Sequence, residues 1–292
     1  MEYKKPINQI IKERSSWRTY TGKTLKEKTL NELKDFIEEQ NESPFEGEHR
    51  VEIININEIE DEKLATLGFV KDCPSYIIGA VLKDEYDSEH YGYVFEKIIL
   101  KATELGLGTC WIGGTFDKTK AKQLIRLRED EKLPAISPLG YAKKRGLKGR
   151  VIRWVIKSKK RKPWSELFFL LDQEKRKLHQ LDSENEKITP FNQPLEMVRL
   201  GPSAKNGQPW RLVLEPSTEG SDPGKYNVHF FRHDSHQYAR LDISIAVCHF
   251  DLMRIQEDIK GSWEFENSRI EGLKQNEIIP GAWLYTITFK TK

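Results

Sequence analysis

The sequence predicts an α+β fold made of two tandem repeats. Within its 292 residues, the order helix, strand, strand, long helix, strand is expected twice. Helices are indicated by apolar residues three or four positions apart, and strands by apolar alternation or short apolar runs. A tryptophan follows each predicted long helix, Trp111 in LGLGTCWIGG and Trp263 in IKGSWEF. The pattern indicates an internal duplication, although any chain that mixes helices and strands can show such loose similarity.

The first repeat is predicted to contain two helices, two strands, a long helix and a third strand. An amphipathic helix is expected at 24–40, because Leu30, Leu33 and Ile37 lie on one face with charged residues opposite. The apolar run SYIIGAV, 75–81, is typical of a buried strand. The other elements are expected at 7–13 (short helix), 50–56 (strand), 91–108 (mostly buried helix ending at glycine) and 135–142 (strand).

A basic segment and a charged connector are predicted to separate the repeats. In 149–164, Val151, Trp154 and Val155 keep helical spacing. Residues 172–190 have few apolar anchors, which favours a linker or surface excursion. The second repeat is expected to contain a helix at 193–200, strands at 210–215 and 226–231, a long helix at 240–259 and a strand at 281–289. The predicted boundaries are 1–168, 169–190 and 191–292, with both repeats in one compact unit.

Composition favours a soluble protein of a reducing compartment. The net charge of +3 does not by itself indicate a nucleic-acid partner. Cys73, Cys110 and Cys248 lie far apart without a CxxC pair, which argues against a disulfide framework or a cysteine-rich metal site. The N-terminus is polar, and the longest apolar run, 73–82, is about half of what a membrane-spanning helix needs. We therefore expect a cytoplasmic protein without a membrane or nucleic-acid partner.

Two motifs are candidates for binding a polar ligand. In RSSWR, an extended chain would place Arg14, Ser16 and Arg18 on one face, where two guanidinium groups and a hydroxyl can bind an anion or a polar ring. The alternative is an exposed basic turn. The loop LGPSAKNGQPW, 200–210, offers a serine hydroxyl, an asparagine amide and backbone N–H groups that suit a polar heterocycle. Its alternative is a plain connection between a helix and a strand.

Glycine-rich and basic segments add two further candidates. The segment GLGTCWIGG lacks GxGxxG spacing and follows a helix, which argues against a Rossmann loop. Gly113 and Gly114 would let a backbone N–H approach a flat ligand, while the segment also suits a helix C-cap and turn. The run KSKKRK, 157–162, suits a solvated helix end, a nucleic-acid or targeting patch, or a phosphate site.

Three histidines are further candidates, as metal ligands. His229, His233 and His236 lie close together in the sequence, with Asp234 between them. No fourth ligand is evident, so surface histidines are favoured over a metal site.

Together, four of these motifs resemble the nitroreductase family of FMN-dependent oxidoreductases. RSSWRTY matches the family's R-x-S-x-R-x-[FY] opening, LGLGTCWIGG its glycine segment after a long helix, and GPSAKNGQPW its A-P-S-x-x-N-x-Q-P-W loop. LGYA and the later KKRKP match a G-Y strand end followed by K-x-R-x-P. The resemblance extends over residues 14–210. It implies a nitroreductase-like fold in which each repeat is a mainly antiparallel sheet flanked by helices.

The order of the motifs departs from the family pattern. In ordinary members the PSxxN loop follows RxSxR closely, but here 41–50 reads NESPFEGEHR and the loop appears in the second half. Ordinary members are homodimers, whose FMN takes RxSxR, the glycine segment and K-x-R from one subunit and PSxxN from the other. The chain therefore resembles a dimer fused into one polypeptide with a single FMN site kept, as in the single-chain "putative TM nitroreductase" branch. A monomer is then expected to suffice.

The resemblance also implies the cofactor contacts and the chemistry. The FMN-binding residues that it implies are Arg14, Ser15, Ser16, Arg18, Gly113, Gly114, Lys159, Arg161, Pro202, Ser203 and Asn206. NADPH or NADH would pass a hydride to flavin N5, and a small acceptor such as a nitroaromatic or a quinone would then receive it in a ping-pong cycle. No catalytic side chain and no metal are required. The alternative is a non-catalytic protein that binds flavin or another flat ligand as a sensor or store.

Overall fold

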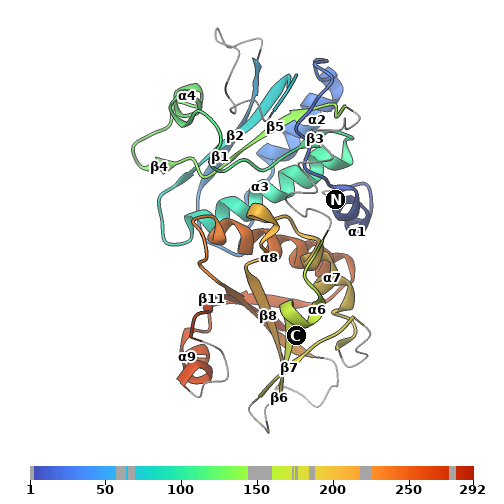
Figure 1. Ribbon diagram of the computed structural model, residues 1–292, viewed down its shortest axis with the longest axis vertical. Helices are drawn as coiled ribbons and strands as arrows, with labels where there is room; N and C mark the ends of the chain where they lie inside the picture. Colours follow the sequence, from blue (N-terminus) through green and yellow to red (C-terminus); the bar gives the residue numbers. More distant parts are fainter. Residues whose placement is uncertain are drawn as a thin grey trace. The chain divides into compact units, whose positions relative to one another are not determined.

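The computed structural model describes residues 3–56, 64, 70–143, 160–172, 174, 177–183, 188–217, 225–275 and 281–292 (Figure 1). By its internal contacts, the chain divides into two units, Met1–Val155 and Ile156–Lys292. Each unit has one sheet and one long helix of its own.

The first unit is built on a five-stranded sheet whose main path is β1-β2-β5-β3. Every pair of neighbouring strands in it is antiparallel. The strands are β1 (His49–Asn55), β2 (Ser75–Leu82), β3 (Gly108–Thr109), β4 (Glu131–Lys132) and β5 (Ile136–Gly140). The helices are α1 (Ile7–Glu13), α2 (Glu27–Glu38), α3 (Asp87–Glu104) and α4 (Lys118–Leu124).

Burial on both faces explains why β2 is almost wholly apolar. Its side chains alternate between the faces of the sheet. Tyr76, Ile78 and Ala80 belong to a core cluster that also takes residues of α4. On the other face, Gly79 leaves room for Tyr91 of α3, because a Cβ there would lie 2.8 Å from the Tyr91 ring. The central strand is therefore packed on both sides, as its continuous apolar sequence predicted.

The second unit is built on a six-stranded sheet in the order β10-β11-β9-β8-β6-β7. All neighbouring pairs are antiparallel except β6 with β8, which are parallel. The strands are β6 (Phe168–Asp172), β7 (Lys177–Gln180), β8 (Trp210–Pro216), β9 (Tyr226–Arg232), β10 (Gly261–Glu264) and β11 (Leu284–Thr291). The helices are α6 (Trp164–Leu167), α7 (Asn192–Leu200), α8 (Ala239–Gln256) and α9 (Asn267–Gln275).

Adjacent residues of β9 show how the faces of this sheet are covered. The Phe230 ring packs edge-on against Phe250 of α8, with the ring centres 5.3 Å apart. Phe231 points the other way, into a cluster that contains Ile270 of α9. The alternation of a strand therefore separates a core under α8 from a second core under α9.

The two units repeat one topology. The path β1-β2-β5-β3 in the first unit corresponds to β8-β9-β11-β10 in the second. Both long helices follow a tyrosine and contain 18 residues. After each helix a tryptophan donates its indole N–H back to a carboxylate of that helix, at 2.7 Å: Trp111 to Glu96 and Trp263 to Asp251. The predicted α+β class, with mainly antiparallel sheets flanked by helices, is confirmed.

Several elements differ from the sequence expectation. The long helix α3 begins at Asp87, four residues before the predicted start at 91. Its first turn was not predicted, because these residues are polar and lack the apolar periodicity of the rest of the helix. It ends at Glu104, four residues before the predicted end at 108, and Gly106 follows with a φ of 76°, which glycine adopts without strain. Residues 160–168, expected in the first repeat, lie in the second unit, and 177–180, expected in the connector, form β7. Val151, Trp154 and Val155 lie outside the described residues.

Candidate functional site

The RSSWR segment runs alongside β3 in the first unit. It leaves α1 at Arg14, whose backbone N–H still bonds the Ile10 carbonyl at 2.9 Å. Ser16 forms a parallel bridge with Thr109, and the Trp17 N–H donates to the Thr109 carbonyl at 2.7 Å. Backbone pairing therefore joins the arginine–serine motif to the glycine segment, although almost a hundred residues of sequence separate them.

A glycine makes this close approach feasible. A Cβ on Gly108 would lie 3.1 Å from Cβ of Trp17 and 3.0 Å from Cβ of Ala142. Those separations are tighter than ordinary van der Waals contact. The second glycine of LGLG thus serves the contact between the two motifs, whereas Gly106 serves the end of α3.

The side chains of Arg14, Ser16 and Arg18 all lower the pKa of one thiol, that of Cys110. Burial raises the pKa of Cys110, and the positive charge of Arg18, a hydrogen bond from Ser16 and the charge of Arg14 partly oppose that rise. All three side chains are half-buried. The sequence prediction that these alternate residues share a face is consistent with this common neighbour. The result is a half-buried basic surface next to the short, buried strand β3.

Gly113 and Gly114 lie in the turn that leads to α4. Ile112, just before them, exchanges two backbone hydrogen bonds of 2.9 Å with Ile136. Gly113 is half-buried and Gly114 is exposed. The turn ends at Asp117, which caps α4 by accepting from the Lys120 N–H at 3.0 Å. Both glycines therefore belong to a turn held at its two ends.

The PSxxN loop lies in the second unit and is conformationally unusual. It connects α7 to β8 and includes a short 3₁₀ turn, Ala204–Asn206. Lys205, Asn206 and Gln208 have φ values of 52°, 57° and 45°. Each non-glycine residue in this left-handed region costs free energy, so the loop needs specific contacts to hold its shape.

Gln208 supplies several of those contacts. Its backbone N–H donates to Ser203 Oγ at 2.9 Å. Its side-chain amide donates to the Arg199 carbonyl at 2.9 Å and accepts from the Lys162 N–H at 2.7 Å. Gln208 is fully buried. It matches the Q of the family motif, but the sequence alone gave no reason to assign it this structural role.

The basic run and the loop meet within the second unit. Arg161 donates to the side-chain oxygen of Asn206 and, at 2.9 Å, to the Leu200 carbonyl. The Asn206 amide in turn donates to the Lys160 carbonyl at 2.9 Å. Two residues that we predicted to contact FMN from different halves thus bind each other in one unit. Lys159 lies outside the described residues.

Asp242, in the first turn of α8, was missed by sequence reasoning. Both its carboxyl oxygens lie 3.1 Å from the Ala204 backbone nitrogen. Burial raises the pKa of Asp242 to about 8, and the hydrogen bond from Ala204 partly opposes the rise. His236 Nε2 lies 3.5 Å from the carboxyl group. In the sequence, this aspartate looks like one polar position of an amphipathic helix.

The histidines occupy different surroundings from those expected. His229 is fully buried in β9, so its prediction as a surface residue is wrong. Its ring nitrogens lie 2.8 Å from Thr288 Oγ1 and 3.1 Å from Glu215 Oε2. His233 and His236 are half-buried. In the part of the chain that the structure describes, no group of three or more His, Cys, Asp or Glu residues is arranged to hold a metal ion.

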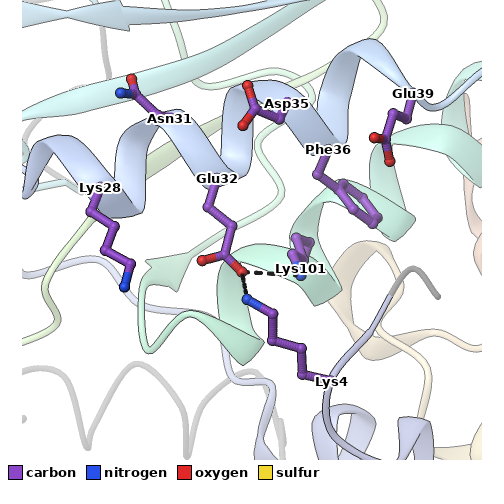
Figure 2. A pocket seen from close by; sticks show the side chains of 8 residues that line it. All are labelled: Lys4, Lys28, Asn31, Glu32, Asp35, Phe36, Glu39 and Lys101. Carbon is purple, nitrogen blue, oxygen red and sulfur yellow. Dashed lines mark hydrogen bonds and ion pairs between the residues drawn. The ribbon is translucent and has the colours of Figure 1, made fainter.

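A hollow of about 490 Å³ lies between α2 and α3 of the first unit (Figure 2). Glu32 stands at its centre, ion-paired with Lys4 and, at 3.6 Å, with Lys101. The Lys101 ammonium also lies 5.4 Å from the centre of the Phe36 ring. None of the predicted FMN-binding residues lines this hollow.

The fold and the two motif-bearing regions define a protein of the nitroreductase type. A family model described as "Putative TM nitroreductase" matches residues 6–254. The chain therefore belongs to this nitroreductase family.

One solved structure that covers nearly the whole chain supports the fold, and two others match about half of the chain. A crystal structure of a putative nitroreductase from Thermotoga maritima is 20% identical, with 98% of this chain and 94% of that chain covered and a TM-score of 0.57. A nitroreductase family protein from Clostridium novyi is 21% identical over 47% of this chain and 86% of its own, with a TM-score of 0.40. An FMN-dependent nitroreductase from Clostridium difficile is 18% identical, covering 47% and 88%, also with a TM-score of 0.40.

No curated protein matches the sequence. Across the described ranges, every helix is too short or too polar to cross a lipid bilayer.

Proposed function

We propose that the protein is an FMN-dependent NAD(P)H oxidoreductase of nitroreductase type that binds one FMN per chain. The observation that supports this most directly is the backbone pairing of Ser16 and Trp17 with Thr109. It joins the arginine–serine motif to the glycine segment, and both motifs are the ones that the family resemblance assigns to the cofactor. Family membership supports the same reading.

The donor set of the first unit fits FMN. A flavin mononucleotide has a phosphate group and a pyrimidine edge that accept hydrogen bonds. Arg14 and Arg18 offer guanidinium forks, and Ser16 offers a hydroxyl, on a half-buried surface. Guanidinium groups suit phosphate and planar polar edges because their N–H groups form paired, charge-assisted bonds. Ser15, Gly113 and Gly114 would add backbone contacts.

The second unit would contribute the loop that covers the ring. Pro202, Ser203 and Asn206 are the residues that the family motif assigns to this role. Arg161 holds Asn206 in place and, with Lys159, is our candidate for the phosphate. Ala204 stands at a position where the motif often has serine, so a hydroxyl contact is absent there.

The protein would act by binding and orienting the partners of a hydride transfer. When bound, FMN would supply the redox chemistry, hydride transfer from NADPH or NADH to a small acceptor such as a nitroaromatic or a quinone. Positive side chains near the pyrimidine would stabilise the additional negative charge of the reduced ring. We assign no catalytic side chain, and we propose that a monomer suffices.

A spectrum of the purified protein tests this proposal. We expect flavin absorbance, or its appearance on titration with FMN to one equivalent per chain, and bleaching on anaerobic addition of NADPH or NADH. Protein that takes up no FMN would contradict the proposal. Two equivalents would contradict the single site. Flavin that neither nicotinamide reduces would favour a flavin-binding sensor or store.

A further inference from the structure

The loop 202–208 holds a strained shape that bonds within the loop and contacts from outside it together maintain. Its left-handed residues, Lys205, Asn206 and Gln208, would relax to other conformations if the loop were free. Gln208 fixes the end next to β8, and Arg161 fixes Asn206. The start of the 3₁₀ turn, at Ala204, needs a separate partner.

That partner is Asp242. The aspartate is the fourth residue of α8, and its own backbone N–H bonds the Tyr238 carbonyl at 2.9 Å. Its side chain is almost completely buried, and the Ala204 N–H points between its two oxygens at 3.1 Å from each. Burial of a carboxyl group to this degree lowers the stability of the fold unless the group makes such a bond, so this is a specific structural contact.

The first unit uses the same helix position for the same purpose. His90 is the fourth residue of α3, which also begins after a tyrosine, and its N–H bonds the Tyr86 carbonyl at 2.8 Å. The His90 ring nitrogen Nδ1 lies 3.0 Å from the Phe45 carbonyl. Phe45 comes four residues before β1, as Ala204 comes six residues before β8. In both units, the first turn of the long helix therefore anchors the chain that enters the hairpin.

The two anchors hold loops of different chemistry. The segment around Phe45, NESPFEGEHR, has none of the PSxxN residues, and Phe45 itself is buried. The loop held by Asp242 keeps Ser203 and Asn206 half-buried rather than covered. Only the anchor in the second unit therefore acts on residues that we assign to the cofactor.

We propose that Asp242 is a positioning residue for the cofactor: its carboxyl group accepts from the Ala204 N–H and so fixes the loop in the shape that presents Ser203 and Asn206 to FMN. This inference rests on the proposed function. It assigns Asp242 no contact with the flavin and no proton transfer.

Three substitutions at one position test the role of the acceptor. Asp242→Asn keeps an oxygen that can accept from Ala204, so FMN affinity should stay within about twofold to threefold of the parent protein. Asp242→Leu fills a similar volume without an acceptor, and Asp242→Ala removes both. Both should raise the Kd for FMN by about tenfold or more, because the Ala204 N–H loses its partner and the loop is no longer fixed. Fluorescence titration with FMN measures these values.

His90→Ala provides the matched control. It removes the anchor at the same helix position of the first unit, so it should lower thermal stability while leaving the FMN Kd unchanged. Equal weakening by His90→Ala and Asp242→Leu would mean that the effect is general destabilisation. Failure of Asp242→Asn to preserve affinity, or unchanged affinity in Asp242→Leu, would likewise overturn the proposal.

Hydrogen exchange in the cofactor-free protein separates this inference from the proposed function. The Ala204 amide should exchange faster in Asp242→Leu than in the parent protein, and near the parent rate in Asp242→Asn. If the parent protein binds no FMN, the proposed function fails, and the positioning of a cofactor fails with it. The exchange pattern then still decides whether Asp242 holds the loop.

Discussion

Asp242, which holds the loop at Ala204, has a buried carboxyl group whose protonation makes stability depend on pH. Burial raises the pKa of this group from 3.8 to about 8, against the opposing effect of the Ala204 N–H. His236 is its titratable neighbour at 3.5 Å, and burial together with the charge of Lys205 lowers the pKa of that imidazole. The carboxyl group therefore faces a mostly neutral ring near pH 7.

The sign of the resulting pH dependence follows from the direction of the shift. A carboxyl group with a raised pKa in the folded state binds a proton on folding, so its contribution is greatest below pH 4 and is lost as pH rises toward 8. We expect urea denaturation between pH 4 and 8 to show a decline in the free energy of unfolding, on the order of 5 kcal/mol, that Asp242→Asn largely removes. Equal pH profiles for the two proteins would contradict the assignment.

A second buried group, His49, also makes stability depend on pH. The effect of Asp242 must therefore be read from the difference in unfolding free energy between the parent protein and Asp242→Asn at each pH. Burial and the charge of His90 lower the pKa of His49 from 6.5 to about 4. A lowered histidine pKa contributes stability above pH 6.5 that is lost as pH falls through 4, which is the opposite sign. The Asp242→Asn difference cancels this contribution, because His49 is present in both proteins and lies in the other unit.

At the scale of elements, the contact between RSSWR and β3 depends on Gly108, which has no side chain to separate them. Gly108→Ala would place a methyl group 3.0–3.1 Å from Ala142 and Trp17, so one of those neighbours must shift. We expect a loss of about 1 kcal/mol in unfolding free energy and weaker FMN binding, because the arginine–serine segment moves with Trp17. Chemical denaturation and FMN titration measure the two effects.

Gly272→Ala is the matched control for that substitution. Gly272 lies inside α9, and a Cβ there would meet nothing within 4 Å. Alanine should therefore stabilise the helix, by about 0.5 to 1 kcal/mol, without affecting FMN. A Gly108→Ala protein that gained stability in the same way would show that the approach of Trp17 to β3 is looser than described.

The elements that could be predicted are those with an apolar period of their own. α1, α7 and the buried strand β2 were expected within a residue or two of their bounds. β3, β4 and β10 were not expected, because two to four residues are too few to show a period. β7, with the sequence KLHQ, is mostly exposed, and its one apolar residue, Leu178, is too little to give a strand signal.

The residues of the candidate site also divide into those that the sequence indicates and those that it does not. Arg18 and Asn206 could be predicted because they stand in motifs that resemble a family. The pairing of Trp17 with Thr109 could not, since it uses backbone atoms that every residue possesses. Asp242 acts through a bond to another backbone N–H, so its role appears only when α8 and the loop are placed together.

At the scale of the whole molecule, the proposed function requires residues of both units to act on one cofactor. Arg18 belongs to the first unit and Asn206 to the second. We expect Arg18→Ala and Asn206→Gly each to raise the Kd for FMN by about tenfold, because each removes a polar contact to the cofactor. Glycine is chosen at 206 because it adopts the φ of 57° without strain, whereas alanine would add a backbone effect.

The double variant and a charge control complete this test. If both residues contact the same flavin without touching each other, the free-energy losses should add, and bound FMN should still saturate at one equivalent per chain. Lys28→Ala removes a positive charge from the hollow on α2, away from the proposed contacts, and should leave the Kd unchanged. An effect of Arg18→Ala without one of Asn206→Gly would mean that the first unit binds FMN alone. The fusion of two repeats would then have preserved a fold but not a shared site.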